Sequence, residues 1–202
     1  MDKFVFGVDL DGVVADFYGG MRPIAAEWLG VDIDSLPVDV TYGLQEWGLD
    51  DAPGGYGALH KFAVTQRGLF KELSPIPGAP SALRELSDAD IRIRIVTHRL
   101  FIKYFHQQAV QQTIEWLDFH DIPYSDLCFM SEKSAVGADL YIDDAPAYID
   151  DLRAAGFSTI VFSNSTNTGM AAPRASTWDE VIPQVLAAEA EWQERKSAPE
   201  AG

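Results

Sequence analysis

Short apolar runs alternate along this chain with segments whose apolar residues recur at helical spacing. Strands are expected at 4–8, 91–96, 127–130, 140–142 and 159–162, and helices at 17–30, 79–86, 103–119, 147–155 and 178–193. This alternation predicts an α/β fold with a doubly wound parallel sheet, a Rossmann-type core. Ligands of such folds collect at the carboxyl ends of the strands. The polar residues that follow the strands are therefore the candidate site.

The first predicted strand ends in two carboxylates one residue apart, Asp9 and Asp11, and Gly12 follows at once. Acidic groups this close repel each other unless a cation neutralises them or they share a proton. Glycine lets the backbone bend sharply just past them. Taken alone, the motif is typical of a solvated strand end. Val-Val-Ala comes next, so the further oxygen ligands of an EF-hand calcium loop are missing.

Other strands end in polar residues too, and this convergence carries more weight than any one motif. Thr97 closes the second predicted strand, and Asp143 and Asp144 follow the fourth. Lys133 lies ten residues before Asp143. Magnesium prefers carboxylates, waters and phosphate oxygens as ligands, and a lysine can offset the charge of a phosphate. Together these residues indicate magnesium-assisted phosphoryl transfer.

Composition narrows the function classes. The 202-residue chain has a formal net charge of −16, which argues against binding to a nucleic-acid polymer or an anionic membrane. A small phosphorylated substrate is compatible with that charge, because a bound divalent cation reverses the local field. The single cysteine, Cys128, excludes an intramolecular disulfide and is expected to be a buried core thiol. Neither a signal peptide nor a bilayer-spanning stretch is visible, so we expect a soluble, cytoplasmic protein.

The stretch 31–65 differs from the rest in its content of Asp, Gly and aromatic residues, and it is punctuated by Pro37 and Pro53. We interpret it as part of an insertion after the first strand. Its Gly-Gly-Tyr-Gly cluster at 54–57 lacks the lysine of a phosphate loop and predicts a turn. The expected division is a catalytic core at 1–16 and 75–195, a small helical cap at 17–74, and a flexible tail at 196–202.

The order of these motifs is familiar. Asp-Leu-Asp-Gly-Val at 9–13, then Thr97, Lys133 and Asp143-Asp144, resembles the haloacid dehalogenase (HAD) superfamily of aspartate-nucleophile phosphatases. The segments 11–17, 72–78 and 133–144 further resemble the 5′(3′)-deoxyribonucleotidase family. The likeness covers about 4–20 and 68–186 and is poor across 31–65.

The resemblance implies chemical roles for the acidic residues. Asp9 would be the nucleophile that forms an aspartyl-phosphate. Asp11 would first protonate the leaving alcohol and then activate water. Mg²⁺ would be held by Asp9, the backbone carbonyl of Asp11 and Asp144, with Asp143 orienting the site or serving as the ligand in place of Asp144.

It also implies substrate-binding residues. Thr97 and Lys133 would hold the phosphoryl oxygens, and Phe17 would contact the nucleoside. After Thr97 the family has a small residue and often proline, whereas this chain has His98-Arg99-Leu100. This departure leaves base and sugar preference open and makes His98 a candidate substrate contact.

Four further residues complete the expectations. Tyr42 and Trp47 of the insertion are candidates for stacking on a base, the alternative being packing within the cap. Arg99 and Lys103 are candidates for phosphate binding, but we expect them at the solvated start of the helix at 103–119.

The function expected from these features is that of a magnesium-dependent phosphomonoester hydrolase, a 5′-nucleotidase acting on nucleoside or deoxynucleoside monophosphates. One alternative is a phosphatase for another small phosphomonoester, such as a sugar phosphate. Others are a phosphotransferase that passes the phosphoryl group to an alcohol, and a non-catalytic regulatory protein, which predicts the loss of a motif residue. The protein is expected to be a monomer or a homodimer.

Overall fold

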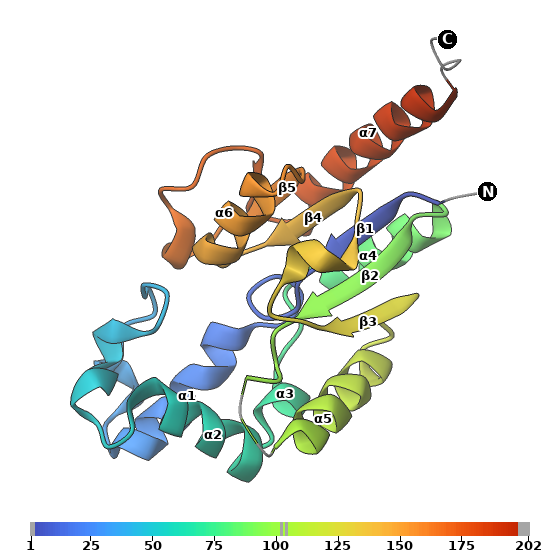
Figure 1. Ribbon diagram of the computed structural model, residues 1–202. Helices are drawn as coiled ribbons and strands as arrows, with labels where there is room; N and C mark the ends of the chain where they lie inside the picture. The colour runs from blue at the N-terminus through green and yellow to red at the C-terminus, as the bar shows by residue number, and fades with distance from the viewer. Residues whose placement is uncertain (1–2, 102, 104, 198–202) are drawn as a thin grey trace.

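The computed structural model describes residues 3–101, 103 and 105–197, and in them six parallel strands form one sheet in the order β3-β2-β1-β4-β5-β6 (Figure 1). The strands are β1 (Val5–Val8), β2 (Arg92–Thr97), β3 (Asp126–Phe129), β4 (Leu140–Asp143), β5 (Thr159–Phe162) and β6 (Arg174–Ala175). The order reverses direction at β1, which pairs with β2 on one side and β4 on the other. This confirms the doubly wound α/β fold.

Helices connect the strands and cover the sheet. They are α1 (Phe17–Leu29), α2 (Gly55–Gln66), α3 (Leu69–Glu72), α4 (Ala79–Asp88), α5 (His106–Phe119), α6 (Pro146–Ala154) and α7 (Trp178–Ser197). Single 3-10 turns lie at η1 (Ile33–Ser35), η2 (Gln45–Trp47), η3 (Leu49–Asp51), η4 (Lys133–Val136) and η5 (Ser165–Asn167). Within the described residues, no helix is long and apolar enough to cross a bilayer.

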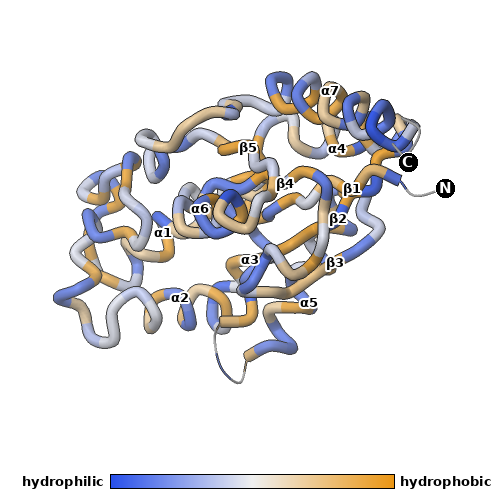
Figure 2. Tube along the Cα trace, turned by 45° about the horizontal axis from the view of Figure 1, so that its top comes forward, coloured by the Kyte–Doolittle hydropathy of each residue, from blue (hydrophilic) through white to orange (hydrophobic). Residues whose placement is uncertain are grey.

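The side chains of β1 alternate between two cores, as the strand period requires. Phe6 and Val8 belong to the larger core, which also holds Leu83 of α4, Trp116 of α5 and Val181 of α7. Gly7 faces the other way, where the ring of Tyr141 lies so close that a Cβ at position 7 would approach it to 2.7 Å. In Figure 2 the strand β1 is largely hydrophobic, while the helical turns alternate between hydrophilic and hydrophobic residues. The adjacent strands β1 and β4 are almost entirely buried, so their carboxyl ends lie in the interior of the sheet.

Residues 17–74, all of them described, hold α1, η1, η2, η3, α2 and α3 and contribute no strand to the sheet. The chain leaves and re-enters the core at one neck. The amide of Asp16 donates to the carbonyl of Ser74 at 2.8 Å, and the amide of Ile76 donates to that of Val14 at 2.7 Å. Figure 1 shows α1 and α2 beyond the arrowheads of the strands, so this segment lies at the edge where a ligand is expected.

Several local expectations were wrong. Cys128 is only half-buried, because β3 is an edge strand. The cluster at 54–57, expected as a turn, is mostly helical. Gly54, with a φ of +81°, is the residue before α2, and Gly55 is the first residue of that helix. The sequence pattern also gave no sign of the two-residue strand β6, which is too short for a periodic pattern.

Helix boundaries differ as well. Helix α5 begins at His106, not at 103. Helix α7 runs to Ser197, so the first two residues of the predicted tail are helical, and the rest of it lies outside the described residues.

Candidate active site

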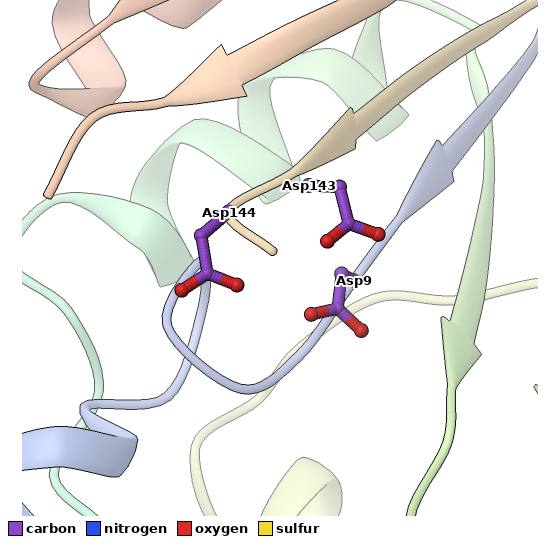
Figure 3. Close-up of side chains that lie close together, drawn as sticks. All are labelled: Asp9, Asp143 and Asp144. Carbon is purple, nitrogen blue, oxygen red and sulfur yellow. The ribbon is translucent and has the colours of Figure 1, made fainter. Parts of the chain in front are cut away.

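Three buried carboxylates meet where β1 and β4 end (Figure 3). Asp9 directly follows β1, Asp143 closes β4, and Asp144 is the next residue. Their ligand oxygens lie within 4.8 Å of one another. Gly12 permits this approach, because a Cβ at its position would lie 2.2 Å from Oδ2 of Asp144, and its φ of +83° suits glycine. The adjacent central strands therefore gather the acidic residues that the sequence predicted to converge.

Lys133 supplies one positive charge to this cluster. Its Nζ lies 2.8 Å from Oδ1 of Asp9 and 2.6 Å from Oδ2 of Asp143, and its side chain is 3% exposed. Burial alone would lower the pKa of Lys133, but Asp143 and Asp9 together raise it above its usual value. The lysine thus stays charged, and three carboxylates face one ammonium group.

The pKa values of the acidic residues reflect this excess of negative charge. Burial, joined by repulsion from Asp143 and Asp144, raises the pKa of Asp9 well above its usual value despite the attraction of Lys133. Burial and Asp143 raise the pKa of Asp144 to about 7. The formal excess of two negative charges, all on oxygen ligands, matches a hard divalent cation. The donor set of this site therefore fits a metal ion.

Asp144 is also held from outside the cluster. Asn164, just after β5, donates its Nδ2 to Oδ2 of Asp144 at 2.7 Å, and the Tyr18 hydroxyl of α1 donates to the same oxygen at 3.1 Å. The side chain of Asn167 donates to the Asp144 carbonyl at 2.8 Å. Such outer hydrogen bonds orient metal-binding carboxylates.

A hydroxyl group without a partner lies beside the carboxylates. The Oγ1 of Thr97, at the end of β2, is buried and has no hydrogen-bond partner within the described part of the chain. An unsatisfied buried hydroxyl costs about 1–3 kcal/mol. Oxygen atoms of a bound anion would satisfy it. The position of Thr97 thus favours an oxyanion ligand.

Above these groups lies a cavity of about 300 Å³ with largely aromatic walls. Its lining comprises Asp9, Asp11, Phe17, Tyr18, Tyr42, Tyr56, His60, Phe70, Thr97, His98, Arg99, Phe101, Lys133, Asp144, Ala145 and Tyr148. The rings of Tyr56 and Phe101 lie 6.4 Å apart and nearly parallel. Burial lowers the pKa of His60 to about 4, so its ring is neutral near pH 7. A charged floor beneath an aromatic wall suits a ligand with an anionic group and a flat ring.

The structure brings most of the predicted site residues together. Those that line the cavity are Asp9, Asp11, Phe17, Tyr42, Thr97, His98, Lys133 and Asp144. Asp143 does not line the cavity, and its Oδ2 accepts a hydrogen bond from Nζ of Lys133 at 2.6 Å. Trp47 is elsewhere: it is 4% exposed, its indole N–H donates to the Pro37 carbonyl at 3.0 Å, and it does not line the cavity. This side chain packs within its own segment, as the alternative interpretation held.

The expectation for Arg99 was wrong. Its side chain is 1% exposed and forms an ion pair with Asp11, Nη2 to Oδ1, at 2.6 Å. Lys103 lies in a turn before α5 and is exposed. Tyr148, also missed, contacts the ring of His98 through its hydroxyl and lies under the ammonium of Lys133 at 4.4 Å. Asn164 could have been found, since it too follows a strand.

Comparison with known proteins gives one consistent answer. A family described as "5′ nucleotidase, deoxy (Pyrimidine), cytosolic type C protein" matches residues 3–191. A protein of Chlorobaculum tepidum, whose name gives 5′(3′)-deoxyribonucleotidase as a candidate activity, is 56% identical over 92% of each chain. The human cytosolic-type 5′(3′)-deoxyribonucleotidase is 28% identical over 89% of this chain and 91% of its own.

Solved structures agree on the fold. A HAD-superfamily hydrolase of Geobacter sulfurreducens matches with a TM-score of 0.58 at 15% identity, over 91% of this chain and 96% of its own. A β-phosphoglucomutase of Clostridium difficile matches with a TM-score of 0.56 at 18% identity, over 96% of this chain and all of its own. At these identities the likeness shows the fold alone.

Proposed function

The chain belongs to the 5′ nucleotidase, deoxy (pyrimidine), cytosolic type C family, and from that premise we propose that it hydrolyses deoxynucleoside monophosphates to the nucleoside and inorganic phosphate. One observation carries the proposal. Three carboxylates with an excess negative charge, one lysine and one unpartnered hydroxyl lie at the floor of an aromatic cavity. The floor suits a metal-bound phosphate, and the wall suits a nucleobase.

The metal of this site is proposed to be Mg²⁺. Asp9, Asp144 and the backbone carbonyl of Asp11 would hold it. Asp143 lies beside them and forms an ion pair with Lys133. Oxygen ligands and a formal charge excess of two support this assignment. When bound, the ion offsets the repulsion between the Asp9 carboxylate and the phosphate dianion.

The proposed reaction has two steps. First, a carboxylate oxygen of Asp9 forms a bond to phosphorus while the bond from phosphorus to the sugar oxygen breaks, and Asp11 gives its proton to that oxygen. Then Asp11 takes a proton from water, the hydroxide attacks phosphorus, and the Asp9–phosphorus bond breaks to release phosphate. Thr97 and Lys133 hold the phosphoryl oxygens throughout.

The insertion at 17–74 is proposed to act as a cap over the site. Two observations support this role. The insertion joins the rest of the chain at one neck, at residues 14–16 and 74–76, and it contributes residues to the cavity lining. The insertion contributes Phe17, Tyr42 and Tyr56 to the cavity lining, and the segment after β2 contributes His98 and Phe101. We propose that Phe17, Tyr42 and His98 contact the nucleoside, whereas Trp47 supports the cap from within.

The proposal is tested by phosphate release from purified protein over deoxynucleoside and ribonucleoside 5′- and 3′-monophosphates and common sugar phosphates, with Mg²⁺ and with a chelator. We expect metal-dependent turnover that favours deoxynucleotides. Preference for sugar phosphates would contradict the proposed substrate class while keeping the chemistry. Transfer to added alcohols at the expense of free phosphate would identify a phosphotransferase.

Thr97→Val is expected to separate binding from folding. Valine keeps the shape of threonine but removes the unpartnered hydroxyl, so the melting temperature should stay unchanged or rise. The loss of a hydrogen bond to a charged phosphoryl oxygen should lower kcat/KM by about 10- to 100-fold. Thermal melting and steady-state kinetics check both expectations. A destabilised variant with normal kinetics would assign the hydroxyl to the fold only.

A further inference from the structure

Arg99 is a buried arginine that nothing in the proposed reaction uses. It is 2% exposed and lies two residues after the end of β2. Its Nη2 lies 2.6 Å from Oδ1 of Asp11, and its Nε lies 3.0 Å from Oδ2 of the same carboxylate. This is a two-point contact, which fixes the orientation of the Asp11 carboxyl group.

Arg99 is itself held from two other elements. Its Nη1 donates to Oγ1 of Thr113 on α5 at 3.1 Å, and that hydroxyl donates to the carbonyl of Ala109 at 2.7 Å. Its guanidinium lies over the ring of Phe70 on α3, 4.2 Å from the ring centre. Contacts on three sides leave the guanidinium little freedom, so Asp11 is tied to the packing of α3 and α5.

Other arginine–carboxylate pairs of the described chain lie elsewhere. Arg92 binds Asp126 through Nε at 2.9 Å and Nη2 at 2.8 Å, with 44% of its side chain exposed, and Arg94 pairs with the same carboxylate at 2.9 Å. None of these three residues lines the cavity, whereas Arg99 and Asp11 both do. The Arg99–Asp11 pair can therefore constrain the cavity, and the Arg92–Asp126 pair cannot.

Asp11 stands apart from the metal cluster. The carboxylates that gather are Asp9, Asp143 and Asp144, and the Asp11 side chain is not among them. In an in-line displacement the leaving oxygen departs on the side of phosphorus opposite the nucleophile. A proton donor must therefore lie away from the nucleophile Asp9, and the pull of Arg99 keeps Asp11 away from the cluster.

We propose that Arg99 is a positioning residue that aims the Asp11 carboxylate at the leaving-group oxygen. The proposal rests on the proposed function, because it assigns Asp11 the proton transfer. Arg99 acts on Asp11 rather than on the phosphate, since its Nε, Nη1 and Nη2 are all engaged within the protein. Proton transfer depends steeply on such orientation.

The test compares two leaving groups in Arg99→Met. A deoxynucleoside departs as an alkoxide that needs a proton, whereas 4-nitrophenolate departs without one. With a deoxynucleoside 5′-monophosphate we expect the first-turnover rate of nucleoside release, which precedes hydrolysis of the aspartyl-phosphate, to fall by about 10²-fold and KM to change by less than about threefold. With 4-nitrophenyl phosphate the first-turnover rate of 4-nitrophenolate release should fall by less than about fivefold, which also shows that the variant is folded.

Further variants sharpen the result. Asp11→Asn should show the same dependence on leaving group, and the double variant should be no slower than Asp11→Asn alone, because both changes remove one function. Arg99→Lys, which keeps the charge, should regain part of the lost rate. Arg92→Met, the matched control at an exposed pair, should leave both substrates unaffected.

Each other outcome contradicts part of the account. Equal losses on both substrates, or multiplicative effects in the double variant, would make Arg99 a structural residue. A large rise in KM on both substrates would make it a phosphate ligand. A wild type that releases no phosphate from either substrate would overturn the proposed function, and the role of Arg99 with it.

Discussion

Replacing Asp9 with asparagine is expected to lower the rate of phosphate release by at least about 10³-fold while leaving the fold intact. An amide has nearly the shape of a carboxylate but cannot attack phosphorus. Asparagine also removes one of three neighbouring negative charges, so repulsion with Asp143 and Asp144 falls. Lys133 keeps its contact with Asp143 at 2.6 Å. Phosphate release and thermal melting measure the two effects separately.

Asp16→Asn is the matched control for this change. Asp16 lies in the same loop and caps α1 by accepting a hydrogen bond from the amide of Gly19 at 2.9 Å. Asparagine caps helices as well as aspartate does, so activity and stability should both be unchanged. Retention of more than about a tenth of the wild-type rate in Asp9→Asn would remove Asp9 from the nucleophilic role.

Lys133→Met is expected to have the largest effect on stability. The substitution leaves three buried carboxylates without a positive charge, and breaking a buried ion pair costs about 3–5 kcal/mol. Activity should fall as well, since Lys133 is proposed to hold the phosphoryl group. Chemical denaturation in the absence of metal measures the free energy of unfolding.

The pH dependence of this variant follows from the raised carboxyl pKa values. A carboxyl group with a higher pKa in the folded than in the unfolded protein adds stability at low pH and loses it as the pH rises through the folded value. That value is about 7 for Asp144, and Lys133 lowers it, so the substitution moves it higher. The stability gap to wild type should therefore widen from about pH 6 to about pH 8, and added Mg²⁺ should narrow it.

Lys71→Met provides the comparison for Lys133→Met. Lys71 pairs with Glu115 at 3.1 Å, but its side chain is 56% exposed, so its removal should change stability by less than about 0.5 kcal/mol. If Lys133→Met were as stable as Lys71→Met without metal, at every pH, then Lys133 would not balance the acidic cluster.

The acidic centre could be predicted from the sequence because it depends on strand ends. Asp9, Thr97 and Asp143 each lie where a parallel strand finishes, and topology alone brings such residues together. Asn164 follows β5 in the same way, so its place beside Asp144 could also have been predicted from the sequence.

The residues that sequence reasoning misplaced depend on packing between distant segments. Arg99 follows a strand and reads as a solvated residue, but Thr113 of α5, Phe70 of α3 and Asp11 enclose it. Nothing near position 99 signals those partners. Trp47 was a candidate for stacking on a base because aromatic residues serve both binding and packing. In the structure the indole N–H of Trp47 donates to the carbonyl of Pro37, ten residues away, so Trp47 packs within the insertion rather than in the cavity.

The most direct test of the central claim is to trap the covalent intermediate on Asp9. Protein mixed with Mg²⁺ and a deoxynucleoside monophosphate would be quenched in acid and reduced with borohydride, which converts an aspartyl-phosphate to homoserine. Peptide mass spectrometry then locates the change. We expect homoserine at position 9 only when substrate and metal are both present, and none in Asp9→Asn. Homoserine at another aspartate would contradict the assignment, and turnover without any trapped intermediate would favour direct attack by water.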